Sequence, residues 1–385
     1  MRSGPQGSGG ELWSAWSSTS CFSEATGELG GSDSLVMLRT DGGASSGVGM
    51  TAAAGLGRGE RAPDMVMASR DGTPTRYYAH AGGRPALLVF ADEACVARLD
   101  ALAEGLTAIG DPPLTVHVVG PPALVGHDLP YPLLQDADGR AAAAYRTGGA
   151  PTAFLLDPNL RVRVRLPFAD GARVAADVAE LVAELVWDDR QPREITTQAP
   201  LLVVPDVLGP EQCAELIAVW EQEGHSETGV ESATGGGRAE QRNAQLKRRR
   251  DHIVQDRQRS RELATTIGRR VMPELSKAFA YRASRFEGFK IACYQASDRG
   301  FFSAHRDNLS PATAHRRFAL TLNLNDGYQG GQLRFPEYGP ELYRPAAGAA
   351  LLFSCSHLHE VLDVTAGRRF VLLSFLFGEE APRPE

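Results

Sequence analysis

Short apolar segments separated by turn-forming residues occupy the C-terminal part of the chain, and they limit the possible folds more than any other feature of the sequence. Six segments follow one another at even spacing, at 288–294, 317–325, 331–335, 349–354, 359–364 and 369–377. Series of short strands of this kind are typical of β-sandwiches and barrels. An apolar strand at 201–208 and helical patterns at 210–220 and 261–280 precede them. The sequence therefore predicts a C-terminal domain over residues 201–380, made of β-sheets with flanking helices.

Two histidines and an aspartate in this region have the spacing of a metal centre. His305 and Asp307 are two positions apart, so both side chains point to the same face if they lie on a strand. His359 lies far downstream, and Arg369 follows it by ten residues. Two imidazoles and one carboxylate are the ligands of the facial triad that binds non-haem Fe(II). An arginine fork at Arg369 suits the distal carboxylate of a dicarboxylic cosubstrate.

Two further histidines lie close to this pattern. His357 would share a strand face with His359, but the spacing to Arg369 favours His359 as the ligand. We expect His357 to line the rim of the pocket or to be a satisfied core residue. His315 lies among polar and basic residues, and we expect it in a solvated loop.

Five short motifs occur in the order of one enzyme family: Ile291–Tyr294, Gly300–Phe302, His305–Asn308, Gly330–Phe335 and Gly348–Phe353. Over about residues 200–378 the chain resembles the prolyl 4-hydroxylase type of 2-oxoglutarate- and Fe(II)-dependent dioxygenases. The resemblance implies a double-stranded β-helix, or jelly roll, with flanking helices. It also implies Fe(II) bound by His305, Asp307 and His359, and 2-oxoglutarate bound by Arg369.

The same resemblance places further residues around the cosubstrate. A tyrosine that matches Tyr294 lines the cosubstrate pocket of the family, and we expect Thr321 or Asn323 to face 2-oxoglutarate. The implied reaction is hydroxylation of a prolyl-type peptide residue or of a small molecule, with release of succinate and CO2, and ascorbate is an implied further ligand. Halogenating relatives replace the carboxylate ligand by a small residue, so Asp307 favours hydroxylation.

Residues 61–187 show the alternation of short apolar strands and helical patterns that is typical of an α/β unit. We expect strands at 84–91, 114–119, 150–157 and 162–166, and helices at 92–109 and 174–187. Together with the motif Gly149–Thr152, this order resembles the thioredoxin fold in its peroxiredoxin-like branch. The resemblance implies a cis bond between Ala150 and Pro151, a rare feature in folded proteins.

Cys95 lies close to the place where such redoxins carry their reactive thiolate. Their threonine three positions earlier is Asp92 here, whose carboxylate disfavours a thiolate, and no second cysteine lies three residues away. We interpret residues 61–187 as a degenerate redoxin domain. The alternative functions are a thiol-dependent peroxidase that uses Cys95 and a redoxin-like module that recruits the substrate.

The remaining segments differ in composition from both predicted domains. Residues 1–60 hold 14 of the 41 glycines together with 11 serines, and such segments bury too little apolar surface to offset the entropy of ordering. We expect a disordered extension here, with Met50 as an alternative start of translation. The polar, proline-bearing stretch 188–200 is expected to link the two domains.

Charge and apolar content exclude several classes of protein. The net charge of −7 argues against a dedicated nucleic-acid-binding protein. A basic stretch over 238–270, densest at Lys247–Arg250, lacks interleaved aromatic residues. Rather than a nucleic-acid patch, we expect a solvated helix face or a loop near the mouth of the site, which could also steer an acidic peptide substrate. No apolar run suits a transmembrane helix, and no export signal or disulfide framework is visible. We therefore expect a cytoplasmic protein that binds no membrane.

Overall fold

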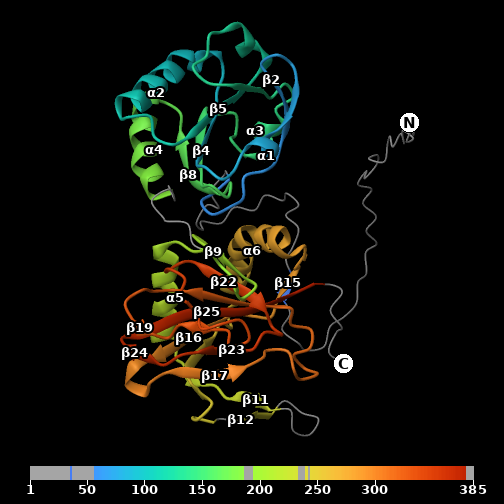
Figure 1. Cartoon of the computed structure of the whole chain (residues 1–385), viewed down its shortest axis with the longest axis vertical. Helices are drawn as coiled ribbons and strands as arrows, with labels where there is room; N and C mark the ends of the chain where they lie inside the picture. Colours follow the sequence, from blue (N-terminus) through green and yellow to red (C-terminus); the bar gives the residue numbers. More distant parts are fainter. Residues whose placement is uncertain (1–34, 37–55, 186–193, 233–238, 242, 379–385) are drawn as a thin grey trace, which may run out of the picture. The chain divides into compact units, whose positions relative to one another are not determined.

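The computed structural model describes residues 35–36, 56–185, 194–232, 239–241 and 243–378. Its strands form one sheet in the N-terminal block, residues 56–185, and two main sheets in the C-terminal block, residues 194–378 (Figure 1). Most of the predicted extension at 1–60 and about half of the predicted linker at 188–200 lie outside the described residues. Both therefore stay predictions.

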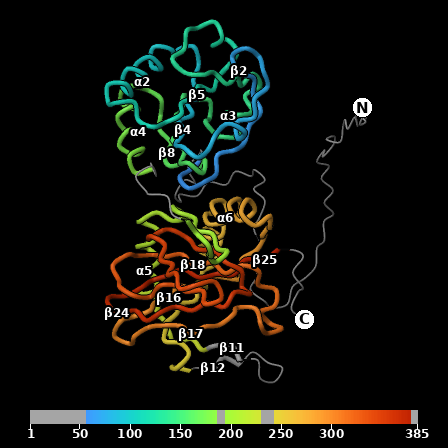
Figure 2. The backbone as a smooth tube through the Cα atoms, in the orientation of Figure 1, coloured from blue at the N-terminus to red at the C-terminus, as the bar shows by residue number. Residues whose placement is uncertain are grey.

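The N-terminal block contains a seven-stranded mixed sheet in the order β3-β2-β6-β5-β4-β7-β8. Figure 2 traces the backbone of this block from blue to green. Its strands are β2 (Val66–Ser69), β3 (Pro74–Arg76), β4 (Ala86–Phe90), β5 (Thr115–Gly120), β6 (Leu133–Gln135), β7 (Thr152–Leu156) and β8 (Val162–Pro167). β4, β5 and β6 run parallel, whereas β7 is antiparallel to both β4 and β8. The predicted strands of this region are thus present, and β2, β3 and β6 were not foreseen.

Helices cover both faces of this sheet. α2 (Val96–Ala108) and α4 (Gly171–Leu185) share one apolar core, whereas α1 (Tyr77–His80) and α3 (Arg140–Ala144) contribute to the core on the opposite face. The contact between α2 and α4 is very close, since a Cβ atom at Gly171 would lie 1.9 Å from the carbonyl oxygen of Arg98. Any side chain at Gly171 would therefore force these two helices apart.

The prediction of a cis bond before Pro151 is wrong, because the described residues contain no cis peptide bond. Gly148 and Gly149 adopt φ values of 70° and 78°, which glycine reaches at little steric cost. These two residues turn the chain ahead of β7, which begins at Thr152. The turn is therefore completed with a trans bond at Pro151.

The C-terminal block has the two-sheet arrangement of a jelly roll. The larger sheet follows the path β10-β14-β16-β25-β18-β22-β9, and the smaller sheet has the order β13-β17-β23-β20-β21. The strands of the larger path are β9 (Leu201–Val204), β10 (Ser226–Glu227), β14 (Arg250–Ile253), β16 (Lys290–Gln295), β18 (Phe318–Asn323), β22 (Ala350–Ser354) and β25 (Arg368–Phe377). Those of the smaller sheet are β13 (Lys247–Arg248), β17 (Phe301–His305), β20 (Leu333–Arg334), β21 (Leu342–Tyr343) and β23 (His359–Val361).

Shorter pairings complete this block. β15 (Arg285–Phe286) joins β25 and also pairs with β1 (Leu35–Val36). Two further two-stranded pairs are β11 (Val230–Ser232) with β12 (Ala239–Gln241), and β19 (Gln329–Gly330) with β24 (Val364–Ala366).

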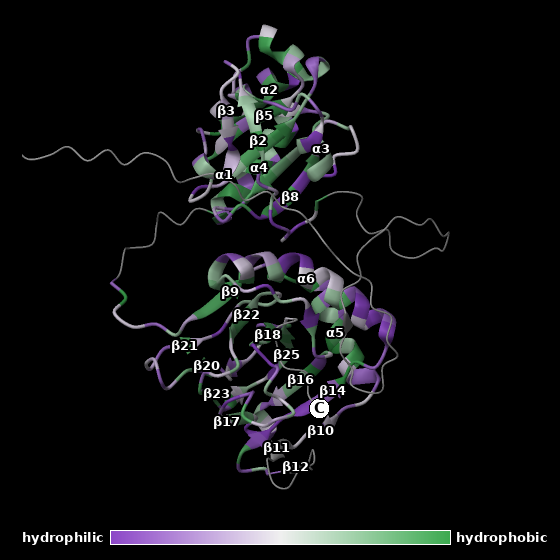
Figure 3. Cartoon of the chain, turned by 90° about the vertical axis from the view of Figure 1, so that its right-hand side faces the viewer, coloured by the Kyte–Doolittle hydropathy of each residue, from purple (hydrophilic) through white to green (hydrophobic). Residues whose placement is uncertain are grey.

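The central strands of the larger sheet divide their side chains between two cores. Ile291 and Cys293 of β16 belong to the outer core, which α5 (Pro210–Gln222) and α6 (Arg257–Phe279) cover. Ala292 and Tyr294 of the same strand belong to the inner core, which includes residues of the smaller sheet. In Figure 3 the hydrophobic colour is strong on β9, whereas β14 and α6 also carry polar residues. The strand period of two thus separates a helix-covered face from a face that is available for a site.

Two elements differ from their predicted bounds for local reasons. β9 ends at Val204 rather than at residue 208, because Pro205 has no N–H to donate and Asp206 has a φ of 55°. α6 begins earlier than predicted, because the Asp256 side chain accepts a hydrogen bond from the backbone N–H of Arg259 (2.7 Å) and caps the helix.

Among the helices of the described residues, none combines the length and the apolar character that a membrane crossing requires.

The four cysteines within the described residues are free and buried, namely Cys95, Cys213, Cys293 and Cys355. Burial raises the pKa of each thiol, to about 11 for Cys213 and about 12 for Cys293.

We expect a Cys21→Ser variant, which retains only these four cysteines, to show no fast reaction with a thiol reagent at neutral pH. All four cysteines should react after unfolding in guanidinium. Rapid labelling of one native thiol, at Cys95 above all, would contradict this account.

Candidate metal centre

The two predicted histidine ligands come from neighbouring strands of the smaller sheet. β17 ends at His305 and β23 begins at His359, and these two residues are directly paired in the antiparallel ladder. Side chains opposite each other in such a ladder project to the same face. The centroids of the two imidazole rings accordingly lie 4.3 Å apart.

Asp307 completes the group from just beyond the end of β17, so the expectation that His305 and Asp307 share one strand is only half right. Its backbone N–H donates to the carbonyl of Cys355 (2.9 Å), which fixes the chain after the strand has ended. Its carboxylate oxygens lie 3.5 Å from Nε2 of His305 and 3.5 Å from Nε2 of His359. One ligand atom from each of the three residues lies within 4.8 Å of the others, so the group can hold a metal ion.

Backbone carbonyls orient both imidazoles. Nδ1 of His305 lies 2.7 Å from the carbonyl oxygen of Ser303, and Nδ1 of His359 lies 3.0 Å from that of His357. A carbonyl only accepts, so Nδ1 carries the proton in each ring and the Nε2 lone pair is left for a metal. Both Nε2 atoms point toward Asp307, as a facial triad requires.

Burial and charge keep the ligands in the protonation states that metal binding needs. Burial lowers the pKa of His359 to about 4, although the Asp307 carboxylate beside it opposes the shift. Burial raises the pKa of Asp307, but His359, His305 and Arg316 outweigh it, so the pKa lies below its usual value. At neutral pH the site therefore offers a neutral His359 and an ionised Asp307.

Aromatic rings enclose the histidines. Phe302 stacks on His305 with ring centroids 3.6 Å apart, and Phe353 packs against His359 with centroids 4.6 Å apart. These contacts restrict rotation of the imidazoles and exclude water from their faces.

A partly buried ion pair of Arg316 with Glu287 supports the backbone at Asp307. Arg316 bonds both carboxylate oxygens of Glu287 (2.7 and 2.6 Å), packs over the ring of Phe375 and donates to the backbone carbonyl of Asp307 (3.2 Å). His315 lies 2.9 Å from the same Glu287 carboxylate and is only 7% exposed. The prediction that His315 is solvated is therefore wrong, because the partly buried Glu287 supplies a partner that the local sequence does not reveal.

His357 lies outside the cluster of ligand atoms. It precedes β23, and its Nδ1 lies 2.9 Å from the hydroxyl of Tyr338. Its side chain is half-buried, in agreement with the expected position at the rim of the site.

The predicted cosubstrate residues share the inner face of the larger sheet, opposite the triad. Tyr294 of β16 is paired with Arg369 of β25, and the Arg369 guanidinium lies 5.4 Å from the centroid of the Tyr294 ring. Asn323 accepts a hydrogen bond from Nη2 of Arg369 (3.2 Å), and Thr321 lies two residues earlier on β18. The structure thus brings Arg369, Tyr294 and Asn323 together and places Thr321 on the same strand face.

The surroundings of Arg369 fit an anionic ligand. The side chain is only 2% exposed, and its buried Nε–H has no hydrogen-bond partner within the described structure. A buried donor without an acceptor is costly unless a ligand completes it, and a carboxylate suits a guanidinium best. Gly331 makes room for this side chain, because a Cβ atom there would lie 3.0 Å from Cδ of Arg369. The chemistry of the donors therefore fits the carboxylate of 2-oxoglutarate.

Sequence reasoning missed residues in the basic stretch. The side chains of Lys247 and Arg249 are only 5% and 9% exposed, and both pair with the buried Asp251. Of the two expected placements, the solvated helix face is therefore wrong for these two residues, because Lys247 lies in strand β13 and both side chains are buried. The alternation of Lys247, Arg249 and Asp251 at every second position was the available signal, because it places them on one strand face.

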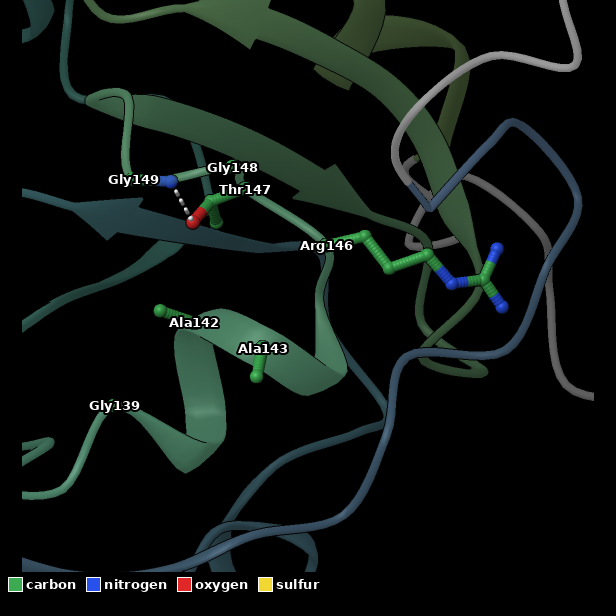
Figure 4. A pocket seen from close by; sticks show the side chains of 7 residues that line it. All are labelled: Gly139, Ala142, Ala143, Arg146, Thr147, Gly148 and Gly149. Atoms are coloured by element: carbon green, nitrogen blue, oxygen red, sulfur yellow. Dashed lines mark hydrogen bonds between the residues drawn. The ribbon is translucent and has the colours of Figure 1, made fainter. Parts of the chain in front are cut away.

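Cys95 has no features of a reactive thiol. It is fully buried, its thiol donates to Oδ1 of Asp92 (3.0 Å), and burial raises its pKa. Figure 4 shows a hollow elsewhere in the N-terminal block, lined by Gly139, Ala142, Ala143, Arg146, Thr147, Gly148 and Gly149. None of these seven residues is a histidine, a cysteine or a carboxylate, so the triad remains the stronger candidate for chemistry.

Comparisons with known proteins point to the same part of the chain. Residues 289–377 match the model of the 2OG-Fe(II) oxygenase superfamily, whose cofactors are Fe(II) and 2-oxoglutarate. A PKHD-type hydroxylase of Caulobacter sp. (strain K31) is 37% identical over 87 residues, which are 21% of this chain and 38% of that protein. A PKHD-type hydroxylase of Xanthomonas campestris pv. campestris (strain 8004) is 26% identical over 178 residues, 44% of this chain and 75% of the relative.

The chain spans less than half the length of the first curated relatives it matches. Among solved structures, a prolyl hydroxylase in complex with a hypoxia inducible factor peptide fragment from Trichoplax adhaerens has 18% sequence identity and a TM-score of 0.39. The superposition covers 48% of this chain and 86% of that one.

Single substitutions of His359 and His357 distinguish the expected metal ligand, His359, from its neighbour His357. We expect His359→Ala to weaken Fe(II) binding by more than about 100-fold, beyond the usual effect of an outer-shell partner. His357→Ala should change it by less than about threefold, because the backbone carbonyl that orients His359 remains. Anaerobic calorimetry measures both, and equal losses in the two variants would contradict the assignment.

The Glu287–Arg316 pair predicts a pH-dependent contribution to stability. Burial raises the pKa of Glu287, but the hydrogen bonds and charge of Arg316 and His315 outweigh it, so the folded pKa is lowered. The contribution is complete above the unfolded pKa of about 4.3 and is lost as the pH falls through the lower folded value. We expect Glu287→Gln to cost about 1–3 kcal/mol at pH 7 in urea unfolding, with a smaller cost in acid. A cost that is independent of pH would contradict this role.

Proposed function

We propose that this chain is a 2-oxoglutarate- and Fe(II)-dependent dioxygenase that hydroxylates its substrate and releases succinate and CO2. The observation that carries the proposal is the convergence of His305, Asp307 and His359 in one donor cluster, with a buried arginine on the opposite sheet. The superfamily match over residues 289–377 covers all of these residues.

Each residue of the site has a distinct role in this proposal. Nε2 of His305, Nε2 of His359 and the Asp307 carboxylate hold the iron. Arg369 binds the distal carboxylate of 2-oxoglutarate through its unpartnered donor, and Asn323 fixes the guanidinium by accepting from Nη2. Tyr294 and Thr321 line the same face beside it. When bound, Fe(II) and 2-oxoglutarate together activate dioxygen for insertion into a C–H bond.

The surroundings of the triad suit oxidation of a bound substrate. Phe302, Phe353 and Phe335 enclose the histidines with apolar surface. An apolar wall limits the access of water to the reacting centre and protects reactive species from side reactions. The intact carboxylate ligand Asp307 supports hydroxylation as the outcome.

For the substrate we propose a prolyl-type peptide residue or a small molecule, with ascorbate as a reductant of the iron. The similarity to PKHD-type hydroxylases supports hydroxylation. Mass spectrometry of a lysate treated with the wild type or with Asp307→Ala tests the substrate class. We expect a product that gains one oxygen atom with the wild type and not with Asp307→Ala. Ascorbate is tested separately: a turnover rate that does not change when ascorbate is added would contradict its role as a reductant.

We also propose that residues 61–187 form a thioredoxin-like domain without redox chemistry, followed by a linker at 188–200 and the oxygenase domain at 201–380. The strand order β5-β4-β7-β8, with β4 and β5 parallel and β7 and β8 antiparallel, supports this fold. The four free cysteines of the described chain are compatible with a cytoplasmic location.

Recruitment of the substrate is the second candidate role of this domain, and the inert environment of Cys95 favours it over a peroxidase. Peroxide consumption that disappears in Cys95→Ser would reverse this preference. A substitution of Thr147, which lines the hollow of Figure 4, tests recruitment of the substrate. Recruitment would be supported if such a variant formed no hydroxylated product but still released succinate at the wild-type rate.

Two adjacent arginines of β25 give a matched test of the proposed reaction. Arg369 is buried beside Asn323, whereas Arg368 is partly exposed and pairs with Glu221 (2.9 Å). With Fe(II), the wild type should convert 2-oxoglutarate to succinate, and Asp307→Ala should lose at least about 100-fold of this rate. Arg369→Met should raise the KM for 2-oxoglutarate by about tenfold or more, because a charged hydrogen bond is lost. Arg368→Met is the control and should leave the KM for 2-oxoglutarate unchanged. Equal turnover of 2-oxoglutarate by the wild type and Asp307→Ala would refute the proposal.

A further inference from the structure

The segment Lys247–Ile253 connects the two sheets of the C-terminal block. Its first part, β13, pairs with β17, the strand that carries His305. Its second part, β14, pairs with β16, the strand that carries Tyr294. Arg249 is the single residue between these two strands, so it lies where the metal side and the cosubstrate side of the site meet.

Side chains of this segment alternate between inside and outside. Lys247, Arg249 and Asp251 point inward, with 5%, 9% and 0% of their side chains exposed. Arg248 points outward, where it lies over the ring of Phe301 and donates to backbone carbonyls. The basic stretch therefore contains one arginine inside the site and a neighbouring arginine outside it.

Arg249 is held by a bidentate ion pair. Its Nε and Nη2 atoms donate to the two carboxylate oxygens of Asp251, both at 2.7 Å. Lys247 and the hydroxyl of Thr228 contact the same carboxylate, which fixes Asp251 from the other side. A bidentate guanidinium–carboxylate pair restricts orientation as well as distance, so Arg249 has a defined position.

The third nitrogen of the Arg249 guanidinium, Nη1, forms a hydrogen bond with Tyr294. Nη1 donates to the Tyr294 hydroxyl oxygen (3.2 Å), and the guanidinium lies 5.6 Å from the centroid of the Tyr294 ring and 5.7 Å from that of Phe302. Arg369 lies 5.4 Å from the same tyrosine ring. Two cations thus flank Tyr294, and only Arg369 has a donor without a partner in the described structure.

We infer that Arg249 is a positioning residue for the cosubstrate, which acts through Tyr294, and this inference rests on the proposed function. A phenol has a single hydrogen, and its oxygen accepts from Arg249. The Tyr294 hydrogen is therefore directed away from Arg249 and is available to donate to the carboxylate of 2-oxoglutarate. Asp251 maintains this arrangement by holding the guanidinium in place.

Binding of 2-oxoglutarate to the full chain loaded with Mn(II) tests the inference without turnover, because Mn(II) accepts the same imidazole and carboxylate ligands. Calorimetry should show that Arg249→Met weakens 2-oxoglutarate binding by about fivefold to tenfold, since one charge-assisted contact no longer orients Tyr294. Arg248→Met is the matched control, and its affinity should stay within twofold of the wild type.

A double-mutant cycle with Tyr294→Phe distinguishes positioning from a general structural effect. In the Tyr294→Phe background, Arg249→Met should weaken binding by less than twofold, because the hydroxyl through which it acts is gone. An undiminished loss in that background would overturn the inference, and so would wild-type affinity of Arg249→Met in the native background.

Arg249→Lys guards against misfolding, because it retains a cation beside Asp251. It should keep the thermal transition of the wild type and still weaken 2-oxoglutarate binding by about threefold or more, since lysine lacks the fork that joins Asp251 to Tyr294. Wild-type affinity in this folded variant would overturn the inference. A wild type that binds no 2-oxoglutarate would instead overturn the proposed function, and the inference with it.

Discussion

The direct pairing of His305 with His359 in the antiparallel ladder of β17 and β23 is the contact on which the rest of the site depends. The chain segments that carry these residues are far apart in sequence, and only the register of the two strands brings the imidazoles together. A slip by one residue would move one ring to the opposite face. Backbone carbonyls two positions before each histidine then orient the rings, so the strand geometry specifies both the position and the tautomer of the ligands.

The two faces of the larger sheet have different roles. The outer face packs against helices and contributes to stability, whereas the inner face carries the residues of the candidate site. Residues such as Ile291 and Leu372 pack under α5 and α6, whereas Tyr294 and Arg369 of the same strands face the smaller sheet. Buried charges on the inner face are costly unless they are paired. Asp251 pairs with Arg249, Asn323 accepts from Arg369, and the donor of Arg369 that has no partner marks the place for a ligand. The burial of these groups therefore has a functional explanation.

The sequence predicted most strands and the grouping of His305, Asp307 and His359, because their signals are residue type, spacing and a period of two. It did not predict features that depend on a distant partner. His315 is buried because Glu287 accepts its hydrogen bond, and Arg249 is internal because Asp251 and Tyr294 surround it. The cis bond expected from resemblance is absent, since the glycines before Ala150 complete the turn in another way. Long-range partners and local backbone geometry were thus the parts that spacing did not reveal.

The central claim is that His305, Asp307 and His359 bind one iron ion. Anomalous X-ray diffraction at the iron edge, from crystals of the full chain loaded anaerobically with Fe(II), tests it most directly. We expect a single strong peak bonded to Nε2 of both histidines and to a carboxylate oxygen of Asp307, with His357 still beside Tyr338. An iron peak bound by other residues, or no peak between these three side chains, would contradict the account.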